Sequence, residues 1–118
     1  NTAPAQTPEL KESVKRGAAI YDDFCMSCHM PDGKGVAKTY PPLADSDYLL
    51  KKREESIKAV KYGLSGEITV NGIKYNNAMA ALGLYDDEVA DVMNYILNSW
   101  GNEDGKIVTV EEVSKIER

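Results

Sequence analysis

Apolar side chains recur at helical spacing in two stretches, one near each end of the chain. In the first stretch, Thr7 is a good N-cap, and Pro8 suits the first helical position because its missing N–H removes no helical hydrogen bond. The helix predicted here brings the chain directly to Cys25. Its apolar face consists of Leu10, Val14, Gly17, Ala18, Tyr21 and Phe24.

The second stretch has the most regular helical pattern in the sequence. Asp86 is its predicted N-cap, and Gly101 is predicted to end it. The acidic side chains of Asp87, Glu88 and Asp91 lie where they interact favourably with the positive end of the helix dipole. The apolar stripe of this helix consists of Val89, Val92, Met93, Ile96, Leu97 and Trp100.

Two shorter helices are predicted between these long ones. The first is capped by Ser46 or Asp47 and runs through Leu50. The second covers roughly residues 54–62 and stops at Gly63. Its side chains expected to face the core are Ile57, Ala59 and Val60.

The remaining pattern predicts a hairpin and a structured C-terminal segment. In residues 68–75, β-forming residues surround an Asn-Gly pair, which is typical of a two-residue hairpin turn. We interpret the hairpin as a small flap rather than part of a larger sheet. Residues 106–108 are expected to be strand-like. Thr109 and Glu112 then have the spacing of a capping box for a last helix that extends to about residue 117.

The composition indicates one small domain with a thin core. A chain of 118 residues corresponds to one domain, and 42% of it is apolar with only one Phe and one Trp. A large apolar cofactor would fill the centre of such a fold. No run approaches the roughly 18 apolar residues of a membrane span. We expect residues 1–7 to be a flexible lead-in, residues 8–101 the main domain, and residues 102–118 an extension packed on it.

Acidic side chains are concentrated in the last third of the chain. Residues 86–118 carry 3 Lys and Arg against 9 Asp and Glu, a net charge of −6 in a chain whose total is −5. Binding to nucleic acid depends on basic contacts with phosphates, so this layout argues against a nucleic-acid partner. The carboxylates are expected mainly to keep the surface soluble, and the alternative is steering toward a basic partner.

The most specific chemistry lies between Cys25 and His29, where the sequence is Cys-Met-Ser-Cys-His. This segment contains both cysteines and the only histidine of the chain. A Cys-x-x-Cys-His segment is the attachment motif of a c-type haem. Cys25, Cys28 and His29 stand at i, i+3 and i+4, so they share one face of a helical turn. The two thiols can each bond one vinyl group of the haem, and His29 can ligate the iron from the same side.

Three other interpretations fit the motif less well. A structural zinc site prefers four Cys or His ligands, and this chain offers three, all in one turn. A thioredoxin-like redox pair would accompany a βαβ pattern, which the sequence lacks. A simple disulfide would leave His29 without a role.

A second axial ligand to the iron has to come from a residue other than histidine, and methionine is the natural choice. Met26 and Met30 flank the motif and cannot reach the opposite face of the ring. Met93 lies on the apolar stripe of the last long helix, where core packing is the expected role. Met79 lies in a loop that can carry its thioether across the haem edge. We therefore predict His29 and Met79 as the two ligands, with ordinary packing as the alternative for Met79.

With these residues in place, the chain resembles a small bacterial class I cytochrome c with a single haem. The resemblance covers most of the chain from about Pro8 to Trp100. The attachment motif alone is fairly specific, and the whole series in this order is strongly so. In order, the landmarks are Gly17, Tyr21, the segment 25–29, Pro41-Pro42-Leu43, the Met79 loop and Tyr95 on the last long helix.

The resemblance implies a mainly α fold in which the N- and C-terminal helices cross around one covalent haem. It implies that Gly17 lets Tyr95 pack closely where the helices cross. It also implies that the carbonyl of Pro41 accepts a hydrogen bond from the second ring nitrogen of His29. Such a contact fixes the tautomer of the ligand and tunes the iron. The other interpretation of the two prolines is a rigid turn, and both roles are compatible.

Two departures from the family pattern change these expectations. The family often has Met-Pro at the ligand, whereas Ala80 follows Met79 here and two asparagines precede it. We therefore expect a less stiff loop and a more labile bond between sulfur and iron. The second departure is the extension after Trp100. The hairpin and this extension are similar to those of cytochrome c domains that serve respiratory reductases and oxidases.

The function predicted from these features is electron transfer rather than enzymatic catalysis. One haem c would cycle between Fe(II) and Fe(III), with both axial positions filled by protein. The alternative is a ligand-binding haem sensor or a weak peroxidase, in which Met79 is displaced from the iron or does not bind it.

A partner is expected to dock at a partly exposed haem edge near Cys25 and Cys28. Lysine side chains could form the rim of this face, and ordinary surface charge is the alternative for them. These candidates are Lys34, Lys38 and Lys74. The candidates for hydrogen bonds to the haem propionates are Tyr48, Tyr62 and Tyr75.

The expected location follows from the haem attachment. The resemblance implies the periplasm or the outer face of the cytoplasmic membrane. The Pro, Ala and Thr stretch at the start resembles a processed terminus, so we expect that a signal sequence or lipid anchor was removed. The expected partners are a terminal oxidase, a reductase or a quinol-oxidising complex. We expect a monomer that meets the membrane only through a removed anchor or a partner.

Overall fold

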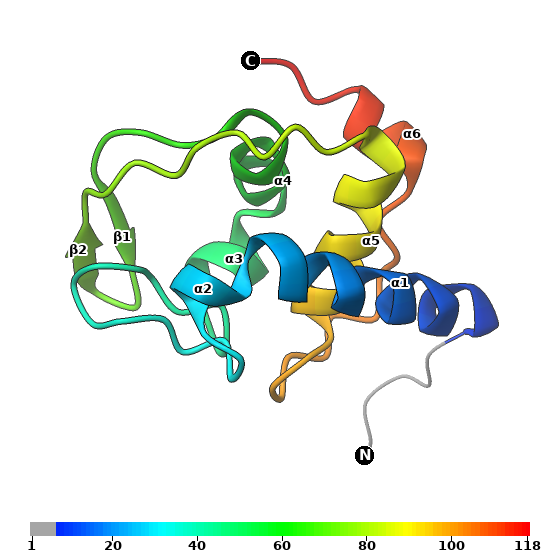
Figure 1. Cartoon of the computed structure of the whole chain (residues 1–118), viewed down its shortest axis with the longest axis horizontal. Helices are drawn as coiled ribbons and strands as arrows, with labels where there is room; N and C mark the ends of the chain where they lie inside the picture. Colours follow the sequence, from blue (N-terminus) through cyan, green and yellow to red (C-terminus); the bar gives the residue numbers. More distant parts are fainter. Residues whose placement is uncertain (1–6) are drawn as a thin grey trace.

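The computed structural model describes residues 7–118, so most of the predicted lead-in lies outside the described residues. The fold is mainly helical, as predicted, with one two-stranded sheet in the described part (Figure 1). Within residues 7–118, no helix combines the length and the apolar character needed to cross a bilayer. In chain order the elements are α1 (Pro8–Phe24), α2 (Met26–His29), α3 (Asp47–Lys51), α4 (Arg53–Tyr62), β1 (Ile68–Val70), β2 (Ile73–Tyr75), α5 (Asp86–Leu97) and α6 (Val110–Ser114).

Helices α1 and α5 form the main packing interface, and α1 passes in front of α5 in Figure 1. The backbones approach closely at Gly17, where a Cβ atom would overlap the carbonyl oxygen of Asp91 and lie 2.8 Å from the Cβ of Tyr95. The predicted contact between Gly17 and Tyr95 is therefore confirmed, and it includes the backbone of Asp91. Thr7 caps α1 as predicted, because its hydroxyl accepts a hydrogen bond from the N–H of Leu10 at 3.1 Å.

Three aromatic rings pack together at one end of this interface. The ring centroid of Tyr21 lies 5.3 Å from that of Tyr95 and 5.1 Å from that of Trp100. The indole N–H of Trp100 donates to the carbonyl of Pro31 at 2.8 Å. A Cβ on Gly33 would come within 2.7 Å of the Trp100 ring, so only glycine fits beneath it. These contacts fix the loop that follows His29 against the α1–α5 interface.

The boundaries of α5 differ from the prediction at both ends. Tyr85, not Asp86, occupies the N-cap, and the carboxylate of Glu88 accepts a hydrogen bond from its N–H at 2.9 Å. The helix ends at Leu97, three residues before Trp100. It ends early because polar side chains of the next residues bond to its last carbonyls. The hydroxyl of Ser99 donates to Tyr95, and the amide of Asn98 donates to Asn94.

The central elements confirm the predictions closely. Ser46 caps α3 by accepting a hydrogen bond from the N–H of Leu49 at 3.1 Å, and α4 ends at Gly63. Strands β1 and β2 pair antiparallel around Asn71-Gly72 and form a separate flap, to the left in Figure 1. The buried apolar side chains of α4 are Ile57, Ala59 and Val60, as predicted.

The C-terminal segment differs from the prediction in two respects. Residues 106–108 form no strand, because the side-chain amide of Asn94 takes the place of a neighbouring strand. It donates to the carbonyl of Val108 at 3.0 Å and accepts from the N–H of Val108 at 2.7 Å. Helix α6 ends at Ser114 rather than near residue 117.

Only half of the predicted capping box forms at the start of α6. The hydroxyl of Thr109 accepts from the N–H of Glu112 at 3.1 Å. The carboxylate of Glu112 instead pairs with Arg53 on α4 through two bonds of 2.7 and 3.0 Å. Arg53 also pairs with Asp104 at 3.1 Å. The extension is therefore bonded to α4 as well as packed on α5.

Candidate cofactor site

The cysteines and the histidine lie in one tight turn at the end of α1. The N–H of His29 donates to the carbonyl of Cys25 at 3.0 Å, and the N–H of Cys28 donates to the same oxygen at 3.2 Å. Cys25 is buried and Cys28 is partly exposed, and no disulfide joins them. This turn gives the two sulfurs and the imidazole the common face that their spacing predicts.

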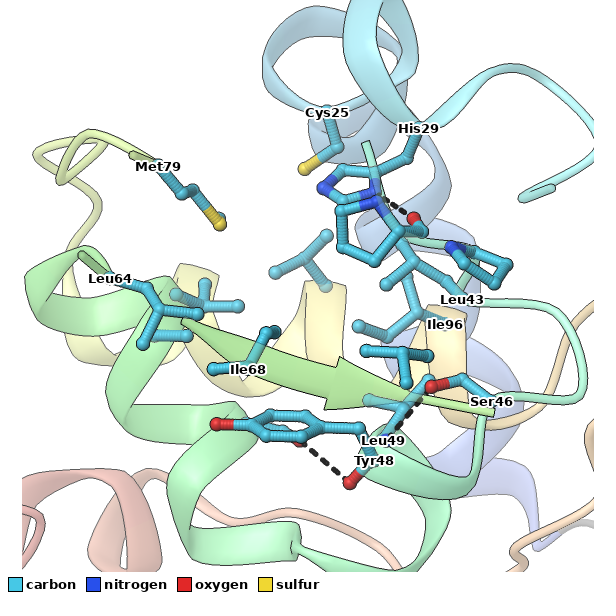
Figure 2. Close-up of a pocket in the computed structure, with 17 residues that line it drawn as sticks. Cys25, His29, Leu43, Ser46, Tyr48, Leu49, Leu64, Ile68, Met79 and Ile96 are labelled. Atoms are coloured by element: carbon cyan, nitrogen blue, oxygen red, sulfur yellow. Dashed lines mark hydrogen bonds between the residues drawn. The ribbon is translucent and has the colours of Figure 1, made fainter. Parts of the chain in front are cut away.

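The imidazole of His29 is buried and oriented by one specific contact. Its Nδ1 lies 2.9 Å from the carbonyl oxygen of Pro41 (Figure 2). Because a carbonyl only accepts, Nδ1 carries the proton and Nε2 keeps its lone pair. Burial lowers the pKa of His29, while the bond to Pro41 acts in the opposite direction. The ring is therefore held as a neutral imidazole with Nε2 available to a ligand.

Two adjoining cavities open beside this turn. The inner cavity extends toward α3, α4 and α5 and leaves about 620 Å³ free of protein atoms, part of it open to solvent. The outer cavity extends toward the residues that precede and follow Met79, with about 830 Å³ measured in the same way. The residues that line both cavities are Cys25, His29, Pro41, Leu64, Ile68 and Met79.

Met79 reaches the inner cavity from the wall opposite His29. Figure 2 shows the sulfur of Met79 and the ring of His29 pointing into the same space, with the sulfur of Cys25 beside the ring. Met93, on α5, is fully buried in the hydrophobic core, as expected, and Met26 packs against that core. Of the four methionines, Met79 alone lines either cavity.

The chemistry of the lining fits a flat, mostly apolar group that contains a metal. Two thiols can bond its edge, while an imidazole nitrogen and a thioether face its centre from two sides. The inner cavity has almost wholly apolar walls, to which Leu49, Val60 and Ile96 contribute. The residues present therefore fit a c-type haem.

The competing interpretations of the motif fit the structure less well. Among residues 7–118, no group of three or more His, Cys, Asp or Glu side chains is arranged to hold a metal ion. Burial raises the pKa of Cys25 to about 11, and the neighbouring Cys28 contributes to this rise. The raised pKa makes Cys25 a poor thiolate nucleophile, because the thiolate is the reactive form.

The structure separates the tyrosine candidates. Tyr48 lines the inner cavity and Tyr75 lines the outer one. Tyr62 lines neither, because it lies at the C-terminal end of α4 and its hydroxyl donates to the carbonyl of Ile116 at 3.0 Å. Tyr62 is therefore no longer a candidate for a propionate contact. The candidate lysines Lys34, Lys38 and Lys74 are exposed, and the cavity linings do not include them.

Sequence reasoning missed the residue that fixes the position of Met79. The backbone of Met79 pairs with that of Leu64 through two hydrogen bonds of 2.8 Å, which form an isolated β-bridge. It also missed the hydroxyl of Tyr21, which donates to the carbonyl of Met30 at 2.6 Å. No local signal marks either contact, because each joins segments whose proximity depends on the tertiary fold.

Comparison with known proteins gives one consistent result. A family described as Cytochrome c matches residues 14–100. The chain is 40% identical over 109 residues to a cytochrome c-552 of Thermus thermophilus, covering 85% of this chain and 82% of that protein. It is 31% identical over 109 residues to the cytochrome c subunit of an alcohol dehydrogenase (quinone) of Gluconobacter oxydans. That match covers 85% of this chain but only 21% of the larger subunit.

A further relative belongs to the same group of subunits. The gluconate 2-dehydrogenase cytochrome c subunit of Pantoea cypripedii is 31% identical over 111 residues. The match covers 91% of this chain and 25% of that protein. The similarity to both dehydrogenase subunits is therefore to a part of each.

Proposed function

The chain belongs to the cytochrome c family, and we propose that Cys25 and Cys28 attach its haem while His29 and Met79 ligate the iron. As a member of this family the protein carries one covalently bound haem c and transfers electrons. When bound, the haem supplies an iron that changes between Fe(II) and Fe(III). Under this proposal residues 8–101 form the haem-binding domain, and residues 102–118 form an extension packed on it.

The observation that carries the ligand assignment is the opposition of His29 and Met79 across one apolar cavity (Figure 2). The carbonyl of Pro41 keeps the proton of His29 on Nδ1, so that Nε2 is free to bind iron. Pro41 thus supports the site without contacting the metal, as the partners of ligating histidines generally do. Ligation by His and Met favours the reduced iron and raises the reduction potential.

The lining explains why a carrier suits this site better than an enzyme. With both axial positions taken by side chains, no position remains for a substrate to bind the iron. The almost wholly apolar walls of the inner cavity offer few polar groups to the iron, which raises the cost of the ferric charge. The role we propose is therefore the passage of single electrons between partner proteins, without catalysis in this domain.

We propose that partners dock where the outer cavity opens beside Cys28. Phe24, next to Cys25, lines this opening and is 45% exposed, so an apolar contact surface adjoins the attachment site. The relatives named above support redox partners of the dehydrogenase type, and a terminal oxidase, a reductase or a quinol-oxidising complex would use the same surface. The proposed location is the periplasm or the outer face of the cytoplasmic membrane.

The test compares two methionines in the haem-loaded protein. Met79→Ala should abolish the charge-transfer band between sulfur and ferric iron and lower the reduction potential. Met93→Ala should keep the band and lower the free energy of unfolding by about 2–5 kcal/mol, because it leaves a cavity in a fully buried position. Optical spectra and a potentiometric titration of both variants measure these effects.

Two outcomes would contradict the ligand assignment. One is loss of the band in Met93→Ala with retention in Met79→Ala. The other is a high-spin ferric spectrum in the unmodified protein, with ready binding of carbon monoxide after reduction. That second outcome would favour the ligand-binding sensor or weak peroxidase over the electron carrier.

A further inference from the structure

The loop that carries Met79 has little support of its own. Residues 76–85 contain no proline, and most of their side chains are exposed. Met79 itself is only partly buried. A loop of this kind opens readily unless another segment fixes it, because it buries few apolar contacts.

The amide of Asn77 donates to the carbonyl of Thr39 at 3.3 Å, and Leu82 and Leu84 pack against the core. The backbone of Met79 itself is held by its pairing with Leu64. The N–H of Leu64 donates to the carbonyl of Met79 at 2.8 Å, and the N–H of Met79 donates to the carbonyl of Leu64 at 2.8 Å. The two bonds are reciprocal, so they fix both the position and the direction of the Met79 backbone. The side chain of Leu64 lines both cavities, so the bridge forms at the wall of the site.

Gly63 makes this close approach possible. Its φ of 86° and ψ of 174° lie in a region that is essentially restricted to glycine. A Cβ atom at this position would lie 2.8 Å from the carbonyl oxygen of Met79 and 2.8 Å from the backbone nitrogen of Ala81. A larger residue would therefore push the loop away from the end of α4.

The end of α4 is in turn bonded to the C-terminal extension. The ammonium of Lys61 donates to the carbonyls of Val113 and Ile116 at 2.8 and 3.2 Å. The hydroxyl of Tyr62 donates to the carbonyl of Ile116 at 3.0 Å. The residues directly before Gly63 are thus fixed from the far side of the helix, so Leu64 forms a firm partner for the loop.

We propose that Gly63 and Leu64 are positioning residues that keep the sulfur of Met79 at the iron. The inference rests on the proposed ligation by Met79. The β-bridge takes the role that a proline after the ligand would have, because it limits the conformations of the loop. Opening of the bridge and loss of the sulfur are then one coupled event.

An external ligand such as imidazole measures this coupling. Imidazole binds the ferric iron only when Met79 has left it, so its apparent affinity is proportional to the population of the open form. Weakening the bridge should therefore raise the imidazole affinity. By reciprocity, imidazole should weaken the bridge.

The experiment uses Gly63→Ala in the haem-loaded protein, with two matched controls. Gly66 and Gly83 also have positive φ values, of 90° and 72°, but a Cβ at either position meets nothing within 4 Å. Gly66→Ala and Gly83→Ala therefore also place an alanine at a positive φ, without a clash at the bridge. We expect Gly63→Ala to raise the imidazole affinity about tenfold, and each control to change it by about twofold or less.

A second measurement needs no substitution. Amide hydrogen exchange of the unmodified protein should show protected N–H groups at Leu64 and Met79. Saturation with imidazole should speed exchange at both and leave the N–H of Val108, bonded to the side-chain oxygen of Asn94, unchanged. This measurement gives a result even if Gly63→Ala does not fold.

Met79→Ala separates failure of this inference from failure of the ligand assignment. If Met79→Ala leaves the imidazole affinity unchanged, Met79 does not ligate the iron and the proposed function is wrong in that respect. If Met79→Ala raises the affinity but Gly63→Ala acts like the two controls, the positioning role is wrong. Protection of the Leu64 and Met79 amides that persists under saturating imidazole would overturn it as well.

Discussion

The two sides of the cavity are built in different ways. On one side, His29 follows directly from α1, its ring bonds to Pro41, and its carbonyl accepts a hydrogen bond from the N–H of Gly35 at 2.9 Å. All of these partners lie within a short stretch of sequence. On the other side, Met79 comes from an exposed loop, and its backbone is fixed by Leu64, fifteen residues earlier in the chain.

The two sides are therefore expected to have different roles: the His29 side attaches the haem, and the Met79 side tunes the iron. The His29 side is local and closely bonded, so it is expected to keep its geometry in both oxidation states. The Met79 side comes from a mostly exposed loop whose backbone pairs with the end of α4 at one bridge. Under the proposed ligation it is therefore the side from which a ligand leaves first. Under the same proposal, the Met79 side decides whether the protein acts as an electron carrier or binds external ligands.

The largest effect is expected at the covalent attachment. A variant with both Cys25→Ala and Cys28→Ala should contain no covalently bound haem, because both thioether bonds are lost. The intact mass after denaturation measures this directly. Ser27→Ala, in the same turn and exposed, is the matched control and should keep the mass of the haem-bound chain. A haem that stays covalently bound without the two thiols would contradict the proposed attachment.

The next effect is expected at the helix crossing that supports the His29 side. Gly17→Ala places a Cβ against the carbonyl of Asp91, and such overpacking costs about 1–3 kcal/mol of the free energy of unfolding. Urea unfolding of the haem-loaded protein measures the change. Ala19→Ser, at an exposed position of the same helix, should change it by about 0.5 kcal/mol or less.

Gly17→Ala also tests whether the two sides of the cavity are independent of each other. Because Gly17 is remote from the bridge at Leu64, Gly17→Ala should leave the imidazole affinity within about threefold of the starting value. A tenfold rise would show that α1 also controls the Met79 side. The separation of the two sides would then be wrong.

The His29 side was predictable from the sequence because its determinants are local. The spacing of Cys25, Cys28 and His29 fixes a common face in any helical turn, and Thr7 and Ser46 act as caps through the next few residues alone. The family resemblance then supplied the partner of the His29 ring.

The parts that sequence reasoning missed depend on long-range contacts. Nothing near Asn94 indicates that its amide pairs with the backbone of Val108, so a strand was predicted there instead. The pairing of Glu112 with Arg53 likewise removed half of a capping box whose local spacing was correct. In each case a polar side chain found a stronger partner in the fold than the one that its local sequence offered.

A smaller effect is expected at Met30, directly after the histidine. Its φ of 70° and ψ of 158° lie in a region that strongly favours glycine, and such strain costs about 1–3 kcal/mol. Met30→Gly should therefore raise the free energy of unfolding, by about 1 kcal/mol after the entropy of the added glycine is subtracted. Chemical denaturation measures the gain.

Met26→Gly is the control for Met30→Gly. Met26 lies in α2 with ordinary helical geometry and packs against the core, so its replacement should destabilise the protein. Opposite signs for the two variants would locate the strain at Met30. A loss of stability in Met30→Gly would show that the contacts of this methionine side chain outweigh the strain.

The smallest effect is expected for the contribution of Glu112 to the pH dependence of the free energy of unfolding. The hydrogen bonds and the charge of Arg53 hold the pKa of Glu112 below its ordinary value of about 4.5, against the effect of burial. A carboxyl with a lowered pKa stabilises the folded state fully above its unfolded pKa. This contribution is lost as the pH falls through the folded pKa. Glu112→Gln should therefore lower the free energy of unfolding at neutral pH by about 0.5–1 kcal/mol, since solvent screens this partly exposed pair.

Once the pH lies well below the folded pKa of Glu112, the unmodified protein and Glu112→Gln should have the same stability, because both then carry an uncharged group at this position. Glu111→Gln, on the exposed face of α6, is the control and should keep the stability of the unmodified protein at neutral pH. Arg53 is the first residue of α4, whereas Gly63 follows its last. Glu112→Gln should therefore lower the free energy of unfolding at neutral pH without raising the imidazole affinity. A rise as large as that expected for Gly63→Ala would show that the whole of α4, and not its C-terminal end alone, fixes the Met79 loop.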